Sequence, residues 1–176
     1  MDQQTFKKVK KREESAFLSM MQEHKGTVYY TALTYFKNED LAREAVQEVT
    51  FRAYKNVHKV RKISAIKAWL TRITINYCLN EIKKNKRFSQ DEQVLEGLSE
   101  SFDPSGSLVL SQAVQSLSKK YQTIVIMKYQ QDLTVTEISE SLGMPVGTVK
   151  TYLNRALKEL RAYMKRGGVN AHDYKA

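Results

Sequence analysis

The segment "LTVTEISESLGMPVGTVKTYLNRALKEL", residues 133–160, decides the fold of the C-terminal part of the chain. Thr134 and Glu137 have the spacing of a capping box, in which each side chain bonds a free backbone N–H at the start of a helix. Gly143 can take the left-handed conformation that ends a helix, and Pro145 suits the first turn of the next one. The segment therefore predicts two helices joined by a tight corner.

The second of these helices has two clearly different sides at about 100° per residue. Its apolar side holds Val149, Leu153, Ala156, Leu157 and Leu160. Its polar side holds Lys150, Thr151, Asn154, Arg155, Lys158 and Arg161. A polar side alone is also typical of any solvated surface helix. Together with the capping box and the short partner helix, it indicates a helix-turn-helix whose second helix enters the major groove of DNA.

The composition indicates a small helical protein. The chain has 176 residues with 41% apolar side chains, enough for one or two small domains. It has only two Pro and seven Gly, and its β-branched runs are short, so we expect an all-α fold. No apolar run of about 18 residues and no signal peptide is evident, which predicts a cytoplasmic location. The single Cys78 is expected to be buried, and the three dispersed His predict no metal site.

Charge divides the chain into blocks. Residues 15–87 carry 14 basic and 6 acidic side chains, net +8, and residues 112–165 carry 8 and 4, net +4. Between them, residues 88–111 hold five acids, Pro104, two Gly and six Ser without any Lys or Arg. We therefore predict two small helical domains joined by a flexible acidic linker, with an N-terminal extension (1–14) and a C-terminal tail (166–176). The basic blocks fit a polyanionic partner, a solubilising surface or a membrane-surface patch.

Helical periodicity and caps place the individual helices. We expect helices near 13–24, 26–36, 39–57 and 65–87 before the linker, and near 108–117, 119–130, 135–142 and 146–164 after it. Asn38 is the expected cap of the third helix.

A second basic constellation lies in "AIKAWLTRITINYCLNEIKKNKR", residues 65–87, and in the preceding loop "NVHKVRKIS". Aromatic rings among cations suit unstacked bases, because a ring can stack on any base while the cations hold phosphate. At helical spacing, however, aromatic residues such as Trp69 and Tyr77 are more often ordinary core side chains. The basic loop, which has no glycine to explain it as a simple turn, is a candidate nucleotide-binding element.

Three motifs in order, "EDLAREAVQEVTFRAYKNV", "IKAWLTRITINYCLNEIKK" and "LTVTEISESLGMPVGTVKTYLNRALKELR", resemble the extracytoplasmic-function group of bacterial RNA polymerase sigma factors over about residues 15–163. The resemblance implies two helical domains that both dock on RNA polymerase core. The first would read and melt the minus-ten promoter element, and the second would read the minus-thirty-five element of promoter DNA. It implies a protein that is not an enzyme and that needs no cofactor or small-molecule ligand.

The same resemblance assigns roles to particular residues. It gives polymerase-core contacts to Leu41, Gln47, Glu48 and Phe51. It gives minus-ten recognition to Val60, Arg61, Lys62, Ile63, Ser64, Trp69, Arg72 and Asn76. It gives minus-thirty-five recognition to Thr148, Lys150, Thr151, Asn154, Arg155 and Lys158. Many relatives carry a larger or aromatic side chain at the position of Asn154, so the bases read cannot be copied from them.

The resulting prediction is an alternative sigma factor for a stress response, controlled by a membrane-anchored anti-sigma factor that covers the same DNA and polymerase faces. A two-domain helix-turn-helix regulator acting without polymerase is the alternative. A nucleic-acid enzyme is disfavoured, because Asp40, Glu44 and Glu48 form one helical face without a His or a second acidic cluster to complete a metal site. The N-terminal "MDQQTFKKVKK" lies outside the family core, and we expect it to be disordered.

Overall fold

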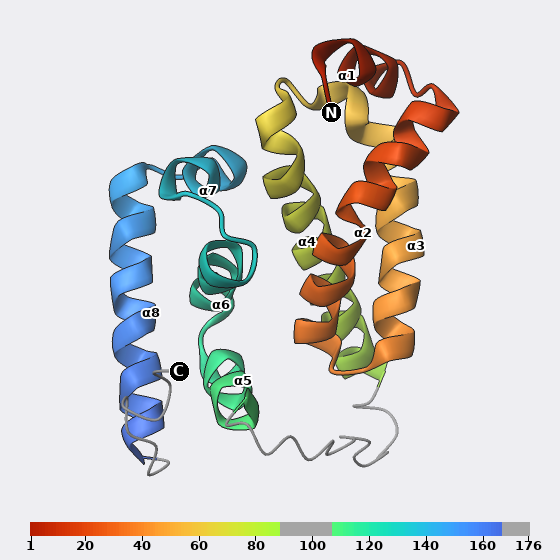
Figure 1. Ribbon diagram of the computed structural model, residues 1–176. Coiled ribbons are helices and arrows are strands. Elements are labelled where there is room, and N and C mark those ends of the chain that lie inside the picture. Colours follow the sequence, from red (N-terminus) through yellow and green to blue (C-terminus); the bar gives the residue numbers. More distant parts are fainter. Residues whose placement is uncertain (89–106, 167–176) are drawn as a thin grey trace. The chain divides into compact units, whose positions relative to one another are not determined.

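The structure, a computed structural model, describes residues 1–88 and 107–166 (Figure 1). The chain divides into two compact units, Met1–Ser99 and Glu100–Ala176. Every regular element in the described residues is helical, which confirms the all-α prediction. Most of the predicted acidic linker and all but the first residue of the tail lie outside the described residues.

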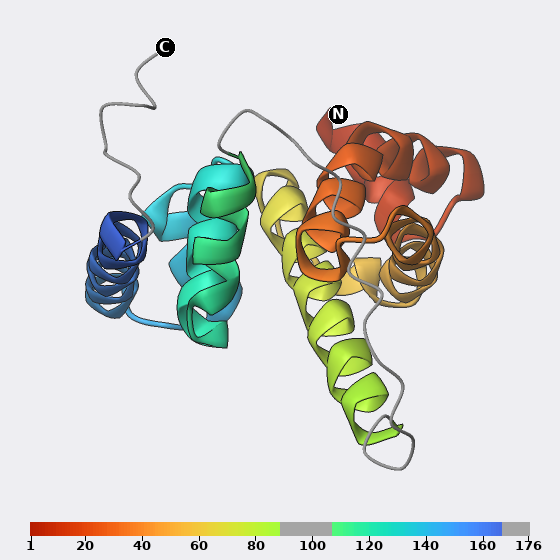
Figure 2. The same cartoon turned by 90° about the horizontal axis from the view of Figure 1, so that it is seen from below.

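Unit 1 is built around three helices, α2 (Glu14–Phe36), α3 (Glu39–Asn56) and α4 (Ile66–Phe88). Helix α2 packs against both α3 and α4, and α3 packs against α4. Figure 2 views α2 and α3 nearly along their axes, with α4 running obliquely beside them. Apolar side chains from all three helices form one buried core, which includes Met20, Val28, Val49 and Leu70.

The corner between α2 and α3 is fixed by local chemistry. Lys37 ends α2 in the left-handed conformation, with φ of 52°. Asn38 then caps α3, because its side-chain Oδ1 accepts a hydrogen bond from the backbone N–H of Leu41 at 2.9 Å. Glu39 and Asp40 follow in the first turn, where the helix dipole favours negative charge. The predicted cap at Asn38 is confirmed.

The prediction of separate helices over 13–24 and 26–36 is wrong, since α2 is continuous through Gly26. A glycine costs a helix about 1 kcal/mol relative to alanine. Buried side chains on both sides of it, Met21 and Val28 among them, outweigh this cost by packing into the core. Gly26 therefore does not end the helix.

The N-terminal extension forms a helix, α1 (Gln3–Lys10), so the expectation of disorder is wrong. Asp2 caps it by accepting a hydrogen bond from the Thr5 backbone N–H at 2.7 Å. Its apolar side chains Phe6 and Val9 are buried in the core of unit 1. Helix α1 lies across the end of the bundle where α2 begins and α3 ends (Figure 1).

The same end of unit 1 carries the connection from α3 to α4. It consists of a short 3-10 turn, η1 (Val57–Lys59), three extended residues, and a second turn, η2 (Ile63–Ala65). This connection, residues 57–65, is called the α3–α4 loop below. Val60 N–H bonds to the Val57 carbonyl at 3.0 Å, and Ala65 N–H bonds to the Lys62 carbonyl at 3.1 Å, so both ends of the loop are folded back on themselves.

Unit 2 contains α5 (Ser107–Ser116), α6 (Lys119–Val125), α7 (Val135–Leu142) and α8 (Val146–Arg166). Helix α8 packs against the other three. Ala113, Val125, Ala156 and Leu160 belong to the shared core of α5, α6 and α8. Helix α5 begins within the range 88–111 that the charge pattern gave to the linker, because acidic composition does not report where helical packing starts.

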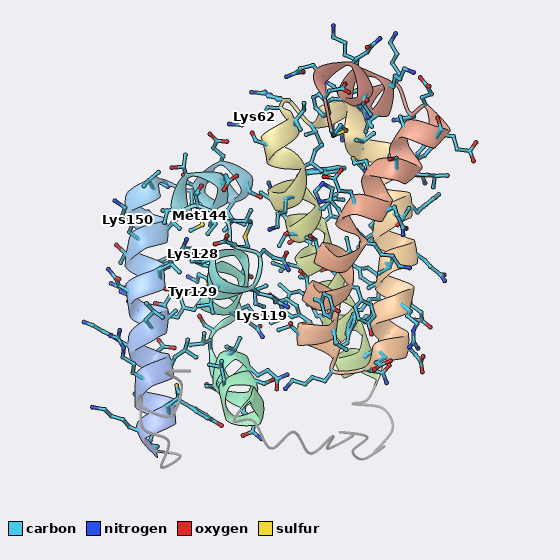
Figure 3. All side chains as sticks on the ribbon, viewed as in Figure 1. Lys62, Lys119, Lys128, Tyr129, Met144 and Lys150 are labelled. Carbon is cyan, nitrogen blue, oxygen red and sulfur yellow. The ribbon has the colours of Figure 1, made fainter. Side chains whose placement is uncertain are left out.

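Helix α6 continues into a π-helical turn, η3 (Ile126–Gln130). Its wider turn is closed by a hydrogen bond from the Gln131 N–H to the Ile126 carbonyl at 3.0 Å. The single helix predicted over 119–130 is therefore correct in extent and differs only in the winding of its last turn. The turn buries Ile126 and Met127 and leaves Tyr129 exposed on the surface (Figure 3).

Candidate nucleic-acid and protein interfaces

The start of the helix-turn-helix is set by a complete capping box. Thr134 Oγ1 accepts a hydrogen bond from the Glu137 backbone N–H at 3.2 Å. In return, Glu137 Oε2 accepts one from the Thr134 backbone N–H at 2.8 Å. Both orphan donors at the start of α7 are thereby satisfied, as the sequence predicted.

The corner between α7 and α8 is equally well determined. Gly143 has φ of 65°, the left-handed conformation that a side chain would strain. The Met144 N–H bonds to the Ser139 carbonyl at 3.1 Å, and the Ser139 hydroxyl donates back to the Met144 carbonyl. Ile138 is fully buried, so α7 holds the N-terminal half of α8 in a fixed direction.

Helix α8 presents one polar side to solvent. Val149, Leu153, Ala156 and Leu160 are buried against the rest of unit 2, and they lie on the side opposite to the polar residues. The polar side, which we call the α8 stripe, consists of the exposed residues Lys150, Thr151, Asn154, Arg155, Lys158 and Arg161. Figure 3 shows Lys150 on the outer side of α8. The predicted separation of core and polar faces is thus present in the structure.

Most of the α8 stripe is uncommitted to internal contacts. Within the part of the chain that the structure describes, five of its six side chains make no hydrogen bond or ion pair: Lys150, Asn154, Arg155, Lys158 and Arg161. Thr151 differs, because its hydroxyl donates to the Gly147 carbonyl at 2.9 Å. Thus five polar side chains within about three helical turns remain available to an external partner.

Thr148 lies at the edge of the α8 stripe. It is half-buried, and its backbone N–H bonds to the Pro145 carbonyl at 2.9 Å in the first turn of α8. At about 160° from Lys150 around the helix, its side chain is at the margin of the face that the other predicted residues share. The fold therefore brings five of the six predicted minus-thirty-five residues onto one face.

The α3–α4 loop is where the predicted minus-ten residues divide between surface and core. Arg61, Lys62 and Ser64 are exposed, and Figure 3 shows Lys62 pointing outward from the end of unit 1. Ile63 is half-buried. Val60, in contrast, is only 4% exposed and belongs to the core of unit 1, so its side chain fixes the loop and is not available to touch a base.

Helix α4 contributes the remaining predicted minus-ten residues on one face. Trp69, Arg72 and Asn76 fall within about 60° of one another around the helix axis. Arg72 and Asn76 are exposed, whereas Trp69 is half-buried and packs against the core. The indole is thus a core side chain that also borders an exposed polar surface. Core packing of Trp69 therefore does not exclude stacking on an unpaired base.

Helix α3 has an exposed face with an apolar character. Phe51 is 54% exposed and Leu41 36% exposed, and Gln47 lies between them. Side chains of this size on an open surface mark contact sites for other proteins when they gather on one face. Glu44, three residues after Leu41, is exposed on the same face and was not among the predicted contact residues.

Glu48 is less free than its neighbours on α3. Its carboxylate accepts a hydrogen bond from Arg52 Nε at 2.7 Å in an ion pair one helical turn apart. The Arg52 guanidinium also lies 4.9 Å from the centroid of the Tyr77 ring on α4. The pair therefore links α3 to α4, and Glu48 can contact a basic partner only while sharing its charge with Arg52.

Burial shifts the pKa values of two side chains in unit 1. Burial raises the pKa of the Cys78 thiol to about 12, and the side chain is fully buried, as predicted. Burial also lowers the pKa of His24. Across 1–88 and 107–166, no group of His, Cys, Asp and Glu side chains is arranged to hold a metal ion. No helix in those ranges is long and apolar enough to span a membrane.

Comparisons with known proteins match both units. Residues 20–88 match the family described as Sigma-70 region 2, and residues 107–160 match Sigma-70, region 4. The chain is 32% identical to RNA polymerase sigma factor SigV of Bacillus subtilis, over 90% of this chain and 97% of SigV. It is 31% identical to the ECF RNA polymerase sigma factor SigW of the same organism, over 94% of this chain and 97% of SigW.

Solved structures show the same fold. The sigma factor RpoE of Bartonella quintana, in complex with the anti-sigma factor NepR, matches with a TM-score of 0.64 at 21% identity, covering 84% of this chain and 97% of RpoE. CnrH, in complex with the cytosolic domain of CnrY, matches with a TM-score of 0.68 at 16% identity, covering 92% of this chain and 96% of CnrH. The two matched regions occur in order, and the relatives align over nearly their whole length. This chain therefore belongs to the extracytoplasmic-function group of RNA polymerase sigma factors, which are transcription initiation factors and not enzymes.

Proposed function

We propose that this sigma factor divides promoter recognition and polymerase binding among three surfaces. The α8 stripe reads the minus-thirty-five element, the exposed part of the α3–α4 loop with Asn76 receives a minus-ten base, and the exposed face of α3 binds RNA polymerase core. The observation that carries the proposal is the α8 stripe. It has five polar side chains without an internal hydrogen bond or ion pair, on a helix whose direction is fixed by the capping box and by Gly143.

The chemistry of the α8 stripe fits promoter DNA. Arg155 can offer a planar fork of donors to a guanine edge or a phosphate, and Asn154 can both donate and accept on a base edge. Lys150 and Lys158 can hold phosphate as point charges. A mixture of this kind combines the contacts that position a helix on DNA with those that read sequence.

The chemistry of unit 1 fits single-stranded DNA. Arg61 and Lys62 give the α3–α4 loop positive charge, and Asn76 supplies donors and an acceptor on the exposed face of α4, about 15 Å along the helix from Ile66. Melting exposes bases that have lost their stacking, at a cost of a few kcal/mol for each base taken out of the helix. Cations for the phosphates and a polar pocket for the base offset this cost.

The exposed face of α3 fits a protein partner. Phe51 is an exposed aromatic side chain whose ring is already covered on one side by Lys55 Nζ, 4.0 Å from the centroid. Burial of such a ring at an interface is a common source of binding energy. Glu44 adds a negative charge, which suits a basic polymerase surface.

An anti-sigma factor is proposed as the regulator, since a related fold was solved with the anti-sigma factor NepR. We include three further points in this proposal: the regulator is anchored in the membrane, a stress signal triggers it, and the sigma factor acts in the cytoplasm. The regulator would cover the α3 face and the α8 stripe, because blocking these two surfaces prevents both polymerase binding and DNA reading.

Gel filtration with RNA polymerase core tests the core-binding part. The chain should co-elute with core as a 1:1 complex, and Phe51→Ser should weaken the complex. Leu18→Ser is the matched control, because Leu18 is similarly exposed, at 52%, on α2 instead of α3. Equal loss for both variants would show that general surface change, and not the α3 face, governs binding. Failure of the parent chain to co-elute would favour the alternative of a regulator that acts on DNA without polymerase.

A further inference from the structure

Helix α1 and the α3–α4 loop share one buried cluster. Phe6 is 4% exposed and Val9 fully buried, and both belong to the same core cluster as Val57 and Val60 of the loop. Helix α1 also packs directly against η1. The first turn of the loop thus packs against a helix outside the three-helix bundle, and that helix precedes the residues matching Sigma-70 region 2.

Arg12 adds a polar tie between the same two segments. It follows α1 in the left-handed conformation, with φ of 61°, an uncommon choice for a residue with a side chain. Its Nη2 donates a hydrogen bond to the Lys55 carbonyl at 2.7 Å and lies 3.0 Å from His58 Nδ1. The Tyr54 hydroxyl donates to the Arg12 carbonyl at 3.4 Å.

These contacts satisfy the end of α3 where the loop begins. Carbonyls in the last turn of a helix have no partner within the helix, and the negative end of the helix dipole favours a cation there. One guanidinium nitrogen, Nη2, reaches both the Lys55 carbonyl and His58, and a lysine ammonium on its shorter, flexible stem would not hold a nitrogen at the same point. Arg12 therefore joins the end of α3 to η1, on the N-terminal side of the exposed residues Arg61 and Lys62.

We propose that α1 and Arg12 preorganise the α3–α4 loop for capture of an unstacked promoter base, which makes Arg12 a positioning residue for promoter opening. The inference rests on the proposed role of the loop in minus-ten recognition. A loop that is already ordered loses less conformational freedom when a nucleotide binds, so more of the contact energy remains to offset unstacking. Loss of the tie should therefore weaken base capture while leaving the bundle and the α3 face intact.

The test uses holoenzyme assembled from RNA polymerase core and the full chain. The probe is a fluorescent non-template oligonucleotide that spans the minus-ten element of a promoter transcribed by this holoenzyme. Further copies of the oligonucleotide each lack one base of the minus-ten element. The captured base is the one whose removal weakens binding by the parent protein. Helix content, thermal unfolding and core affinity are measured for every variant.

Arg12→Gln removes the guanidinium, and Lys11→Gln removes a neighbouring exposed charge as the matched control. Arg12→Lys keeps the charge and serves if the first variant folds poorly. Arg12→Gln and Arg12→Lys should each bind the intact strand about fivefold more weakly than the parent. For the strand that lacks the captured base, the affinity should fall by less than about twofold. The difference between the two losses is a pairwise coupling of ordinary size. Lys11→Gln should bind both strands within about twofold of the parent.

Three results would overturn the inference in distinguishable ways. In the first, Arg12→Gln binds the strand as the parent does, while the loop variant Arg61→Gln binds it more weakly. The loop would then remain the minus-ten site, and Arg12 would have no role in it. Equal losses of the intact and abasic strands would show that Arg12 only maintains structure. No effect of Arg61→Gln or of any abasic position would refute the proposed role of the loop itself.

Discussion

Replacement of Arg155 by alanine is the sharpest perturbation of the α8 stripe. Arg155 is exposed and makes no internal hydrogen bond or ion pair in the described part of the chain, so its truncation should leave the free energy of unfolding within about 0.5 kcal/mol of the parent. Any loss of DNA binding then belongs to the missing contact. If the guanidinium makes a bidentate contact with a base edge, the loss is about 1–3 kcal/mol at that base, roughly 5- to 150-fold in affinity.

Arg155→Lys and Lys150→Ala separate base reading from phosphate contact. Arg155→Lys keeps the charge but loses the fork, so it should also weaken recognition of the matching base pair. Lys150→Ala should weaken binding to every sequence alike and should make the salt dependence shallower by about 0.9 in the slope of log K against log salt. The α8 stripe has four cations: Lys150, Arg155, Lys158 and Arg161. If each neutralised one phosphate, together they would contribute at most about 3.6 to the slope of log K against log salt.

The assay is fluorescence anisotropy with a minus-thirty-five duplex across a salt series, on variants whose helix content matches the parent. Arg166→Ala is the matched control, because it removes the same side chain from the same helix about 16 Å farther along the axis. If Arg155→Ala bound its duplex as tightly and as selectively as the parent, the α8 stripe would be a solvated surface. The placement of the recognition helix would then be wrong.

Further predictions concern the interior and the linker. Cys78 should resist iodoacetamide at pH 8 until the protein unfolds, because burial raises its pKa to about 12; labelling of the native chain at the rate of a free thiol would contradict its burial. Burial lowers the pKa of His24 in the folded protein below its ordinary value of 6.5. As pH falls, the imidazole is therefore protonated in the unfolded state before it is protonated in the folded state. The free energy of unfolding should consequently decrease below about pH 6.5. His24→Gln should remove this part of the pH dependence in urea titrations, and an unchanged profile would assign it to other groups. Replacing the five acids of residues 88–111 by Ser should change abortive initiation and promoter escape while duplex binding stays the same; an unaltered abortive pattern would mean that the acids only solubilise.

The helix-turn-helix was predictable because its determinants are local. The capping box of Thr134 and Glu137, the left-handed Gly143 and the two-sided pattern of α8 each depend on residues a few positions apart. The cap at Asn38 was predictable for the same reason. Local hydrogen bonds and helical periodicity can be read without knowledge of the tertiary fold.

What the sequence did not reveal depends on contacts between distant segments. Helix α1 has two buried side chains, and it is stabilised by packing on α2 and on the α3–α4 loop, whose residues lie about 50 positions away. The burial of Val60 and the contact of Arg12 with His58 have the same origin. Gly26 was misleading because its local preference is outweighed by the burial of its neighbours in α2.

The sequence located the candidate faces more reliably than the state of each side chain on them. Leu41, Gln47 and Phe51 are exposed on α3 as expected. Glu48 shares that face but is paired with Arg52, which also reaches across to Tyr77 on α4. Such pairing is decided by rotamers and by the neighbouring helix, so spacing along the chain predicts the face and not the partner.

Run-off transcription tests the central claim most directly. RNA polymerase core is incubated with genomic promoter fragments with and without the chain, and transcripts are mapped at their 5′ ends. The account predicts discrete transcripts that appear only when chain and core are both present, and that fall strongly with Arg155→Ala but not with Arg166→Ala. Equal transcript patterns with and without the chain would contradict the claim that it directs promoter-specific initiation.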